Sequence, residues 1–476
     1  MAYPYVWGIV ERGKARVKVK NVEGEEVVLG HNDFAFVGGS ISNLTELAEK
    51  AGVSGRPGDV VCALYRQSGP DGFNLLKGDF IIVHWRGEAQ ELTLVRDKFG
   101  IYNMYYIQGD KGDLAFSTSL TQLANTGLVS NEIDLNSLYQ FFSLGVILPP
   151  RTAYQRVHSV EPGQYVRYRD GTLEKHGYTD IELPREKTAD RKYLVETCLQ
   201  LLTRAVSRAC EDATDIGVYL SGGIDSAVVL SLAKQEAQGK QVLAFTMGPW
   251  GESSSELNYA RLSAEFSGVE QVEWHAGAKD LNHLPYLVSL LEQPNFDTAA
   301  LSYYILAKEA KKYGVTTMLA GQNADTIMGS IPYVKYIYWS DRIQHYLTHR
   351  VSRVFGKFST LLPQEKLRNR LSFMLTPEHC VTKHLYFKTQ LFYKYKDDLF
   401  PFIKRIEEGE IFQPLYDSVA FIGNRDIADR IIYLDERFTE APRCLEAMQK
   451  SADGMTVKLP YYDQDVVDFS LRVPNK

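Results

Sequence analysis

The chain has 476 residues, two to three times the usual size of a single domain, which predicts two or more folded cores. Hydrophobic residues make up 45% of the chain and charged residues 24%, a balance that supports globular cores and excludes a disordered, collagen-like or low-complexity protein. The net charge of -6 gives no overall basic field, which argues against a generic binder of nucleic acids or membrane surfaces.

The sequence contains no pattern of a membrane span or a secretory leader. Apolar runs are broken by charge or glycine well before the roughly 20 residues that a spanning helix needs. The N-terminus lacks the basic and apolar regions of a signal peptide. The five cysteines show no metal-ligand or CxxC spacing, which predicts reduced thiols in the core: Cys62, Cys198, Cys210, Cys380 and Cys444. We therefore expect a soluble, cytoplasmic protein without membrane contact.

Up to about residue 180 the sequence is typical of short strands separated by turns. Residues 78–85 and 92–95 are apolar segments on either side of a turn at Gly87, which is the pattern of a hairpin. Helical stretches at residues 42–48 and 134–141 interrupt the strands, and each begins with a polar residue that can cap its first turn. These elements predict an α+β sandwich as the first domain.

Residues 180–190 lose periodicity and contain Pro184, which is typical of a linker. After them, buried strands alternate with amphipathic helices, a pattern that predicts a parallel sheet wrapped by helices. We expect strands at residues 216–220, 242–247 and 315–320, and helices at residues 193–210, 226–236 and 256–267. Helical patterns dominate residues 333–453. The predicted domains are therefore residues 1–183 and residues 190–476.

The most informative segment joins a strand to a helix through Gly222 and Gly223. Glycines let a phosphate approach the backbone, while the hydroxyls of Ser221 and Ser226 and the free N–H groups of the helix start supply donors. Asp225 is unfavourable beside phosphates unless a divalent cation neutralises it. No lysine follows the glycines, so the segment is not a P-loop, and it lacks the GxGxxG spacing of dinucleotide folds. A simple tight turn would not need two serines and an aspartate, so we favour a phosphate site.

This segment, Ser221 to Ser226, resembles the SGGxDS pyrophosphate loop of ATP pyrophosphatases, and specifically the asparagine synthetase branch. The resemblance implies an α/β adenine-nucleotide α-hydrolase-like (PP-loop) synthetase domain with a helical C-terminal part. It also implies that the loop binds ATP so that a substrate carboxylate attacks the α-phosphate, giving an acyl adenylate and a Mg²⁺-bound pyrophosphate. Asp225 would then be a metal ligand.

A second segment, residues 318–329, resembles the SGEGADExFGG stretch of the same family. Gly321, Asp325 and Gly329 match. By this resemblance Asp325 is the second acidic anchor for magnesium and pyrophosphate, although an aspartate there could also simply cap a helix. Three positions differ from the family's Glu, Gly and Glu: Gln322, Asn323 and Thr326. The difference predicts a changed acceptor side of the pocket. The nucleotide is expected to be bordered by Leu220, Met247, Gly248, Ala320 and Gly321.

Residues 454–463 parallel the family's GxExRxPFLD, with Thr456 at the position of the glutamate. Lys458, Pro460 and Asp463 belong to this stretch. We expect these three residues to hold the domain together rather than to react.

The first part of the chain resembles the glutaminase fold of the N-terminal nucleophile class. The similarity lies in residues 36–43, 76–80 and 96–101 and in Tyr105-Tyr106. In that class a processed cysteine at position 2 attacks glutamine, whereas this sequence has Ala2 there. Alanine offers no thiol or hydroxyl, and Cys62 is a poor substitute, so we expect a retained scaffold that does not hydrolyse glutamine.

A degenerate glutaminase domain beside an adenylation loop resembles the β-lactam synthetases, carbapenam synthetases and lasso-peptide macrocyclases, which use an amine already on the substrate. The resemblance covers nearly the whole chain. These families continue beyond the counterpart of residues 466–474 with a segment that carries a catalytic lysine. Lys476, a partner protein or a missing segment could supply that group, and Gln322 is a further candidate for a catalytic side chain.

Residues 333–405 are rich in lysine and arginine and poor in acidic residues, with four aromatic residues at the start: Tyr333, Tyr336, Tyr338 and Trp339. Such a segment could bind an acidic or peptide substrate, or RNA through phosphate contacts and stacking. A solvated helical face with aromatic core positions explains the same composition, and we favour it.

From these motifs and resemblances we expect the chain to be an AMP-forming carbon-nitrogen ligase that depends on ATP and Mg²⁺. We expect it to act in a peptide or specialised-metabolite pathway. Its expected substrate is a small molecule or peptide that carries a carboxylate and an amine, and nucleic acid is not an expected partner. The alternatives are an ammonia-dependent amidating enzyme, an RNA-modifying PP-loop enzyme, and a pseudoenzyme that serves a biosynthetic complex.

Overall fold

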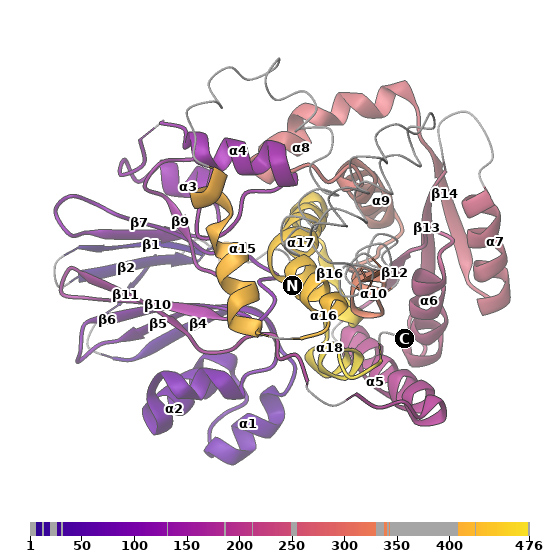
Figure 1. Cartoon of the computed structure of the whole chain (residues 1–476), viewed down its shortest axis with the longest axis horizontal. Coiled ribbons are helices and arrows are strands. Elements are labelled where there is room, and N and C mark those ends of the chain that lie inside the picture. The colour runs from indigo at the N-terminus through magenta and orange to yellow at the C-terminus, as the bar shows by residue number, and fades with distance from the viewer. Residues whose placement is uncertain are drawn as a thin grey trace.

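The computed structural model describes residues 6–11, 14–19, 26–29, 32–130, 132–184, 187–211, 213–248, 255–329, 338–339, 342, 408–423 and 425–474. Two parts lie side by side, an antiparallel β-sandwich and a parallel sheet covered by helices (Figure 1). Among the described residues, no helix is long and apolar enough to cross a bilayer.

The first domain is built from two antiparallel sheets. The first sheet has the order β3-β2-β1-β8-β7-β9 and the second the order β11-β10-β6-β5-β4. The strands are β1 (Val6–Glu11), β2 (Lys14–Val19), β3 (Glu26–Leu29), β4 (Phe34–Ile41), β5 (Gly78–Arg86), β6 (Glu91–Arg96), β7 (Tyr105–Gln108), β8 (Leu114–Ser117), β9 (His158–Ser159), β10 (Gln164–Arg169) and β11 (Thr172–Gly177). Their helices are α1 (Leu44–Ala51), α2 (Pro57–Ser68), α3 (Leu120–Ala124) and α4 (Leu135–Leu144). The expected sandwich and hairpin are confirmed.

Strand β5 is buried on both faces because one face meets the other sheet and the other face meets helices. Ile81 and Val83 point into the sandwich core, while Phe80 and Ile82 pack with residues of α1 and α2. The sequence analysis missed α2, although Pro57 at its first turn is a recognised start signal.

The second domain contains a five-stranded parallel sheet with the order β14-β13-β12-β15-β16. Its strands are β12 (Ile216–Tyr219), β13 (Val242–Gly248), β14 (Glu270–His275), β15 (Thr317–Leu319) and β16 (Thr456–Lys458). The helices are α5 (Arg191–Glu211), α6 (Ile224–Glu236), α7 (Ser255–Ser267), α8 (Leu284–Leu291), α9 (Ala300–Lys312), α10 (Ala324–Ile327), α15 (Glu408–Ile422), α16 (Ile427–Leu434), α17 (Glu440–Ser451) and α18 (Gln464–Ser470).

The order in which successive strands are added to the sheet reverses at β12. The chain runs from β12 to β13 and β14 with α6 and α7 as crossovers, and then returns to β15 on the other side of β12. Helix α9 packs on β12 and β13 from the return path. Such a switch point leaves a crevice beyond the carboxyl ends of the strands, where ligands bind in open α/β sheets.

Helices α16, α17 and α18 lie between the sandwich and the parallel sheet (Figure 1). Ion pairs cross the domain boundary here, from Lys77 to Asp465 at 2.7 Å and from Lys98 to Asp468 at 3.0 Å. No helix or strand occupies the described residues between β11 and α5, as the linker pattern predicts. The division at residues 183 and 190 stays a prediction.

Candidate nucleotide site

The segment Leu220 to Gly223 leaves β12 at the switch point and leads directly into α6. Leu220 is buried, and its N–H donates to the carbonyl of Phe245 on β13 at 2.9 Å. Ser221 and Gly223 are exposed. The segment therefore presents an open loop on a firmly held strand end.

The backbone conformation and the close packing at position 222 require a glycine. Its φ of +84° lies in the left-handed region, and a Cβ there would stand 2.1 Å from the carbonyl oxygen of Glu256 on α7. Any larger side chain would push the loop away from α7.

The two serines of the loop form a hydrogen-bonded pair. The Ser221 and Ser226 hydroxyl oxygens lie 3.1 Å apart, and the Ser226 hydroxyl donates to the carbonyl of Gly223 at 3.0 Å. The N–H of Ser221 donates to the Ser226 oxygen at 3.2 Å. Ser226 is buried and fixes the loop from below, while the exposed Ser221 and the first N–H groups of α6 face outward. This arrangement can bind an anion at the helix start.

Asp225 and Asp325 lie close enough for the charge of one to act on the other. Gly321 after β15 makes the approach possible, because a Cβ there would lie 2.8 Å from the N atom of Ser226 and 2.9 Å from the carbonyl carbon of Asp225. Burial and the charge of Asp325 raise the pKa of Asp225 above its ordinary value. Asp325 lies in the first turn of α10, and Asn323, with φ +86°, occupies the N-cap position of that helix. The alternative role of Asp325 as the cap is therefore not the one seen.

Two neighbouring carboxylates, of which Asp225 has a raised pKa, fit a divalent cation. Mg²⁺ is usually held by one or two carboxylates together with phosphate oxygens and water, rather than by a full protein cage. In the described part of the chain, no group of three or more His, Cys, Asp or Glu residues is arranged to hold a metal ion.

The other predicted border residues lie at neighbouring strand ends. The N–H of Ala320 donates to the carbonyl of Lys458 on β16 at 3.2 Å, and Ala320 is buried. Met247 and Gly248 end β13, and a Cβ at Gly248 would lie 3.0 Å from Nδ1 of His275. Gln322 is half-buried in the loop after β15. Whether these residues contact a nucleotide stays a prediction.

Tyr461 is a further candidate for the site, and the sequence analysis did not single it out. Burial and the charge of Asp225 raise the pKa of the Tyr461 hydroxyl, so this side chain lies within electrostatic reach of Asp225. The amide of Asn323 donates to the Tyr461 carbonyl at 3.3 Å. Lys458 and Asp463 bond to Ser40 and Arg208, in agreement with the structural role expected for them. Tyr461 lies three residues after the end of β16, and no local sequence pattern marks it as a site residue.

A cavity of about 290 Å³ lies at the domain boundary, away from the loop. Its walls include Ser40 and Asp79 of the first domain and Lys458 of the second. Burial raises the pKa of Asp79 to about 6. None of the residues 220–226 lines this cavity, so it is distinct from the candidate nucleotide loop.

Several predicted residues lie outside the described part of the chain. They include Ala2, Lys476, Cys380 and most of the basic segment 333–405. Of the described cysteines, Cys62, Cys210 and Cys444 are buried and Cys198 is half-buried, and all four are free thiols as expected.

Comparison with known proteins assigns both halves of the chain. The family model for asparagine synthase matches residues 197–476, and the model for a glutamine amidotransferase domain matches residues 36–179. The chain is 29% identical over 329 residues to glutamine-hydrolysing asparagine synthetase 1 of Bacillus subtilis. The alignment covers 67% of this chain and 51% of that protein. It is 26% identical over 292 residues to the amidase chry2 of Gibberella zeae, covering 57% of this chain and 42% of that protein.

A putative asparagine synthetase of Methanocaldococcus jannaschii is 23% identical over 327 residues, covering 67% of this chain and 62% of that protein. The chain thus spans about half the length of the curated relatives it matches. The family model covers more than half of the chain and includes both the Ser221–Ser226 loop and the carboxylate pair. By its sequence and by the sheet that holds this loop, the chain belongs to the asparagine synthase family.

Proposed function

We propose that this chain is an ATP-dependent ligase that adenylates a substrate carboxylate and then forms an amide. The observation that carries the proposal is the meeting of Asp225 and Asp325 beside an open loop of serines and glycines at the switch point of the sheet. An anion-binding loop with two adjacent carboxylates suits a metal-bound pyrophosphate leaving group better than a single transferred phosphate.

In the first step, a carboxylate oxygen of the substrate forms a bond to the α-phosphorus of ATP. The bond from that phosphorus to the bridging oxygen of the β-phosphate breaks, and pyrophosphate leaves. Ser221 and the N–H groups at the start of α6 bind the leaving group, and Gly222 and Gly223 allow it to approach the backbone. Asp225 and Asp325 would hold Mg²⁺, which neutralises charge on the phosphates when bound.

In the second step, an amine nitrogen attacks the activated acyl carbon, loses a proton, and displaces AMP. We propose that the amine belongs to the same small-molecule or peptide substrate, because ring closure gains effective molarity. The resemblance to the amidases of fungi is compatible with a role in specialised metabolism. Free ammonia as the amine is the alternative. Lys476 and Gln322 are the candidate side chains for the acyl-transfer step.

The test is to identify the cleaved phosphate bond. Purified protein, Mg²⁺ and α-labelled ATP are incubated with candidate acids, and the nucleotide products are separated. Formation of labelled AMP with an equal amount of pyrophosphate supports the proposal. Formation of ADP and orthophosphate contradicts it, and the absence of any Mg²⁺-ATP binding indicates a pseudoenzyme.

A further inference from the structure

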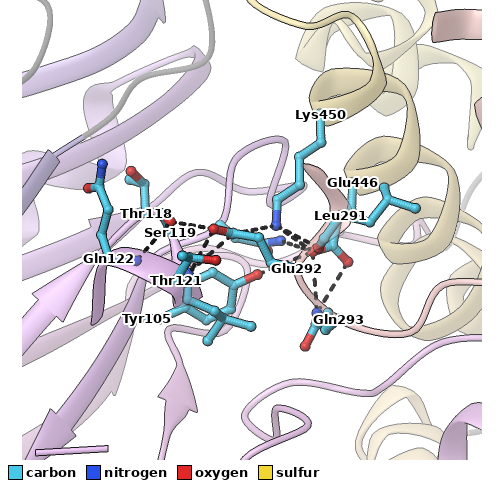
Figure 2. Close-up of polar contacts among 12 residues, drawn as sticks. Tyr105, Thr118, Ser119, Thr121, Gln122, Leu291, Glu292, Gln293, Glu446 and Lys450 are labelled. Atoms are coloured by element: carbon cyan, nitrogen blue, oxygen red, sulfur yellow. Dashed lines mark hydrogen bonds and ion pairs between the residues drawn. The ribbon is translucent and has the colours of Figure 1, made fainter. Parts of the chain in front are cut away.

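A buried group of charged side chains of the second domain makes hydrogen bonds to the first domain (Figure 2). We call Glu292, Glu446 and Lys450 the boundary cluster. The Lys450 ammonium lies 3.0 Å from a carboxylate oxygen of Glu292 and 3.2 Å from one of Glu446, and it donates to the Leu291 carbonyl at 3.0 Å. The Lys450 side chain is 3% exposed and the carboxylates are 9% and 5% exposed.

The second domain supplies all three charges, but the first domain supplies much of their hydrogen bonding. Glu446 accepts from the amide of Asn103 at 3.1 Å and from the hydroxyl of Tyr105 at 3.2 Å, both in the first domain. Gln293 of the second domain also donates to Glu446. Because buried carboxylates need partners, Glu446 depends on the sandwich for its environment.

Glu292 makes the reciprocal contact, since it caps a helix of the first domain. It accepts from the Ser119 hydroxyl, from the Leu120 N–H at 3.1 Å and from the Thr121 N–H at 3.2 Å, at the start of α3 (Figure 2). Burial by itself would raise the pKa of Glu292, but Lys450 and Ser119 lower the pKa below its ordinary value. Glu292 is therefore an ionised group whose charge is balanced from both domains.

Helix α17 connects this cluster to the nucleotide loop. It carries Glu446 and Lys450 and leads into β16, and the amide of Gln449 donates to the Val457 carbonyl of that strand at 3.2 Å. The carbonyl of Lys458, next on β16, accepts from the N–H of Ala320. Gly321 follows and lies against the start of α6, beside Asp225. A displacement of α17 would therefore move the loop that brings Asp325 to Asp225.

We propose that the first domain acts as a positioning scaffold for the nucleotide site, and that it acts through the boundary cluster, α17 and β16. Lys450 and Glu446 are positioning residues, since neither lies at the loop. This inference rests on the proposed function in one respect, because one of its two measurements is the binding of Mg²⁺-ATP. It gives the sandwich a role that requires no glutamine chemistry.

The test compares the full-length wild type with Lys450→Met, Tyr105→Phe and Lys77→Met. Lys450→Met keeps the length of the side chain and removes its charge, and Tyr105→Phe removes one donor from the first domain. Lys77→Met is the matched control, because it removes a lysine that also bridges the domains but pairs with Asp465 on α18 at a more exposed position. Amide hydrogen exchange is measured without nucleotide, and the Kd for Mg²⁺-ATP is measured by calorimetry.

We expect Lys450→Met to speed exchange at residues 320–325 and 221–226 at least tenfold and to weaken Mg²⁺-ATP binding to a similar degree. Tyr105→Phe should shift both quantities in the same direction by a few fold, and Lys77→Met should change each less than twofold. Equal exchange at these loops in wild type and Tyr105→Phe, or equal effects of Lys450→Met and Lys77→Met, would overturn the inference.

The experiment separates the two proposals. If the wild type does not bind Mg²⁺-ATP, the proposed function fails, while hydrogen exchange of the nucleotide-free protein still decides the positioning role. If Lys450→Met does not fold, Tyr105→Phe decides it, because that variant loses a single hydroxyl.

Discussion

Asp225 and Asp325 are two carboxylates that the fold brings together from segments a hundred residues apart. Replacing either with asparagine keeps the side-chain size and removes a charge that would stabilise a bound cation. We predict that Asp225→Asn and Asp325→Asn each lower Mg²⁺-dependent pyrophosphate formation by about 10²-fold or more. Initial rates of pyrophosphate release provide the measurement.

Asp215→Asn is the control for these variants, because Asp215 stands just before β12, at the opposite end of the strand from the loop. It should retain the wild-type rate. A wild-type rate for either Asp225→Asn or Asp325→Asn would remove that residue from the metal site.

Gly321 permits the close packing of the two loops, so a single methyl group should disturb them. In Gly321→Ala the new Cβ would lie 2.8 Å from the backbone nitrogen of Ser226, and backbone cannot move aside as a side chain can. We predict a loss of stability of about 1–3 kcal/mol and at least tenfold weaker Mg²⁺-ATP binding. Urea unfolding and calorimetry measure the two effects. Gly55→Ala, which meets no atom within 4 Å, should leave both unchanged; tight ATP binding by Gly321→Ala would count against the loop geometry.

At the scale of single elements, the buried histidine of strand β5 leads us to expect that the stability of the protein depends on pH. His84 on β5 is 1% exposed, and burial lowers its pKa from 6.5 to about 4. Between these pH values the His84 imidazole is therefore protonated in the unfolded chain and neutral in the folded chain. Stability from neutral His84 is complete above pH 6.5 and falls by about 1.4 kcal/mol per pH unit as the pH drops toward 4.

This contribution is isolated by comparing the wild type with His84→Gln. Asp97 acts in the opposite direction, because burial and the charge of Asp79 raise its pKa to about 7, but it is present in both proteins. The urea midpoint at pH 7 minus the midpoint at pH 5 should be more positive in the wild type than in His84→Gln. The exposed His176→Gln serves as the control. Equal pH dependence in wild type and His84→Gln would refute the role of His84.

Elements with strong periodicity or clear end signals could be predicted from the sequence, and weaker ones could not. The strand at residues 216–220 and the helix that follows were expected and are present as β12 and α6. Strand β14 was missed because Glu270 and Glu273 interrupt its apolar pattern at the edge of the sheet. Strand β16 has only three residues, and its place in the sheet depends on pairing with β15, which no local pattern contains.

At the scale of the whole molecule, those residues of the candidate nucleotide site that belong to a sequence motif could be predicted. The residues 221–226 and 325 follow from resemblance, and the parallel sheet explains why they meet. Tyr461 and the boundary cluster were not predictable, because their partners are far apart in the sequence: Tyr105 and Glu446 are 341 positions from each other. Hydrogen bonds over such separations depend on how the domains pack, which periodicity does not record.

The first domain should not hydrolyse glutamine in this chain. Cys62 is the first cysteine of the sequence, and it is buried in α2, where burial raises its thiol pKa to about 11. A protonated, buried thiol is a poor nucleophile. We predict that incubation with amide-labelled glutamine releases no glutamate above a heat-killed control, and that Cys62→Ala behaves identically. Steady glutamate release that disappears in Cys62→Ala would show that this thiol reacts.

The late position of β16 has a consequence for synthesis on the ribosome. Strand β15 ends at Leu319, but its neighbour β16 begins only at Thr456. At about 5–20 residues per second, on the order of ten seconds pass between translation of the two strands. During that interval the nascent chain presents β15 as an open edge, which is a template for unwanted pairing. Completion of the sheet that carries the nucleotide loop therefore requires synthesis of its last strand.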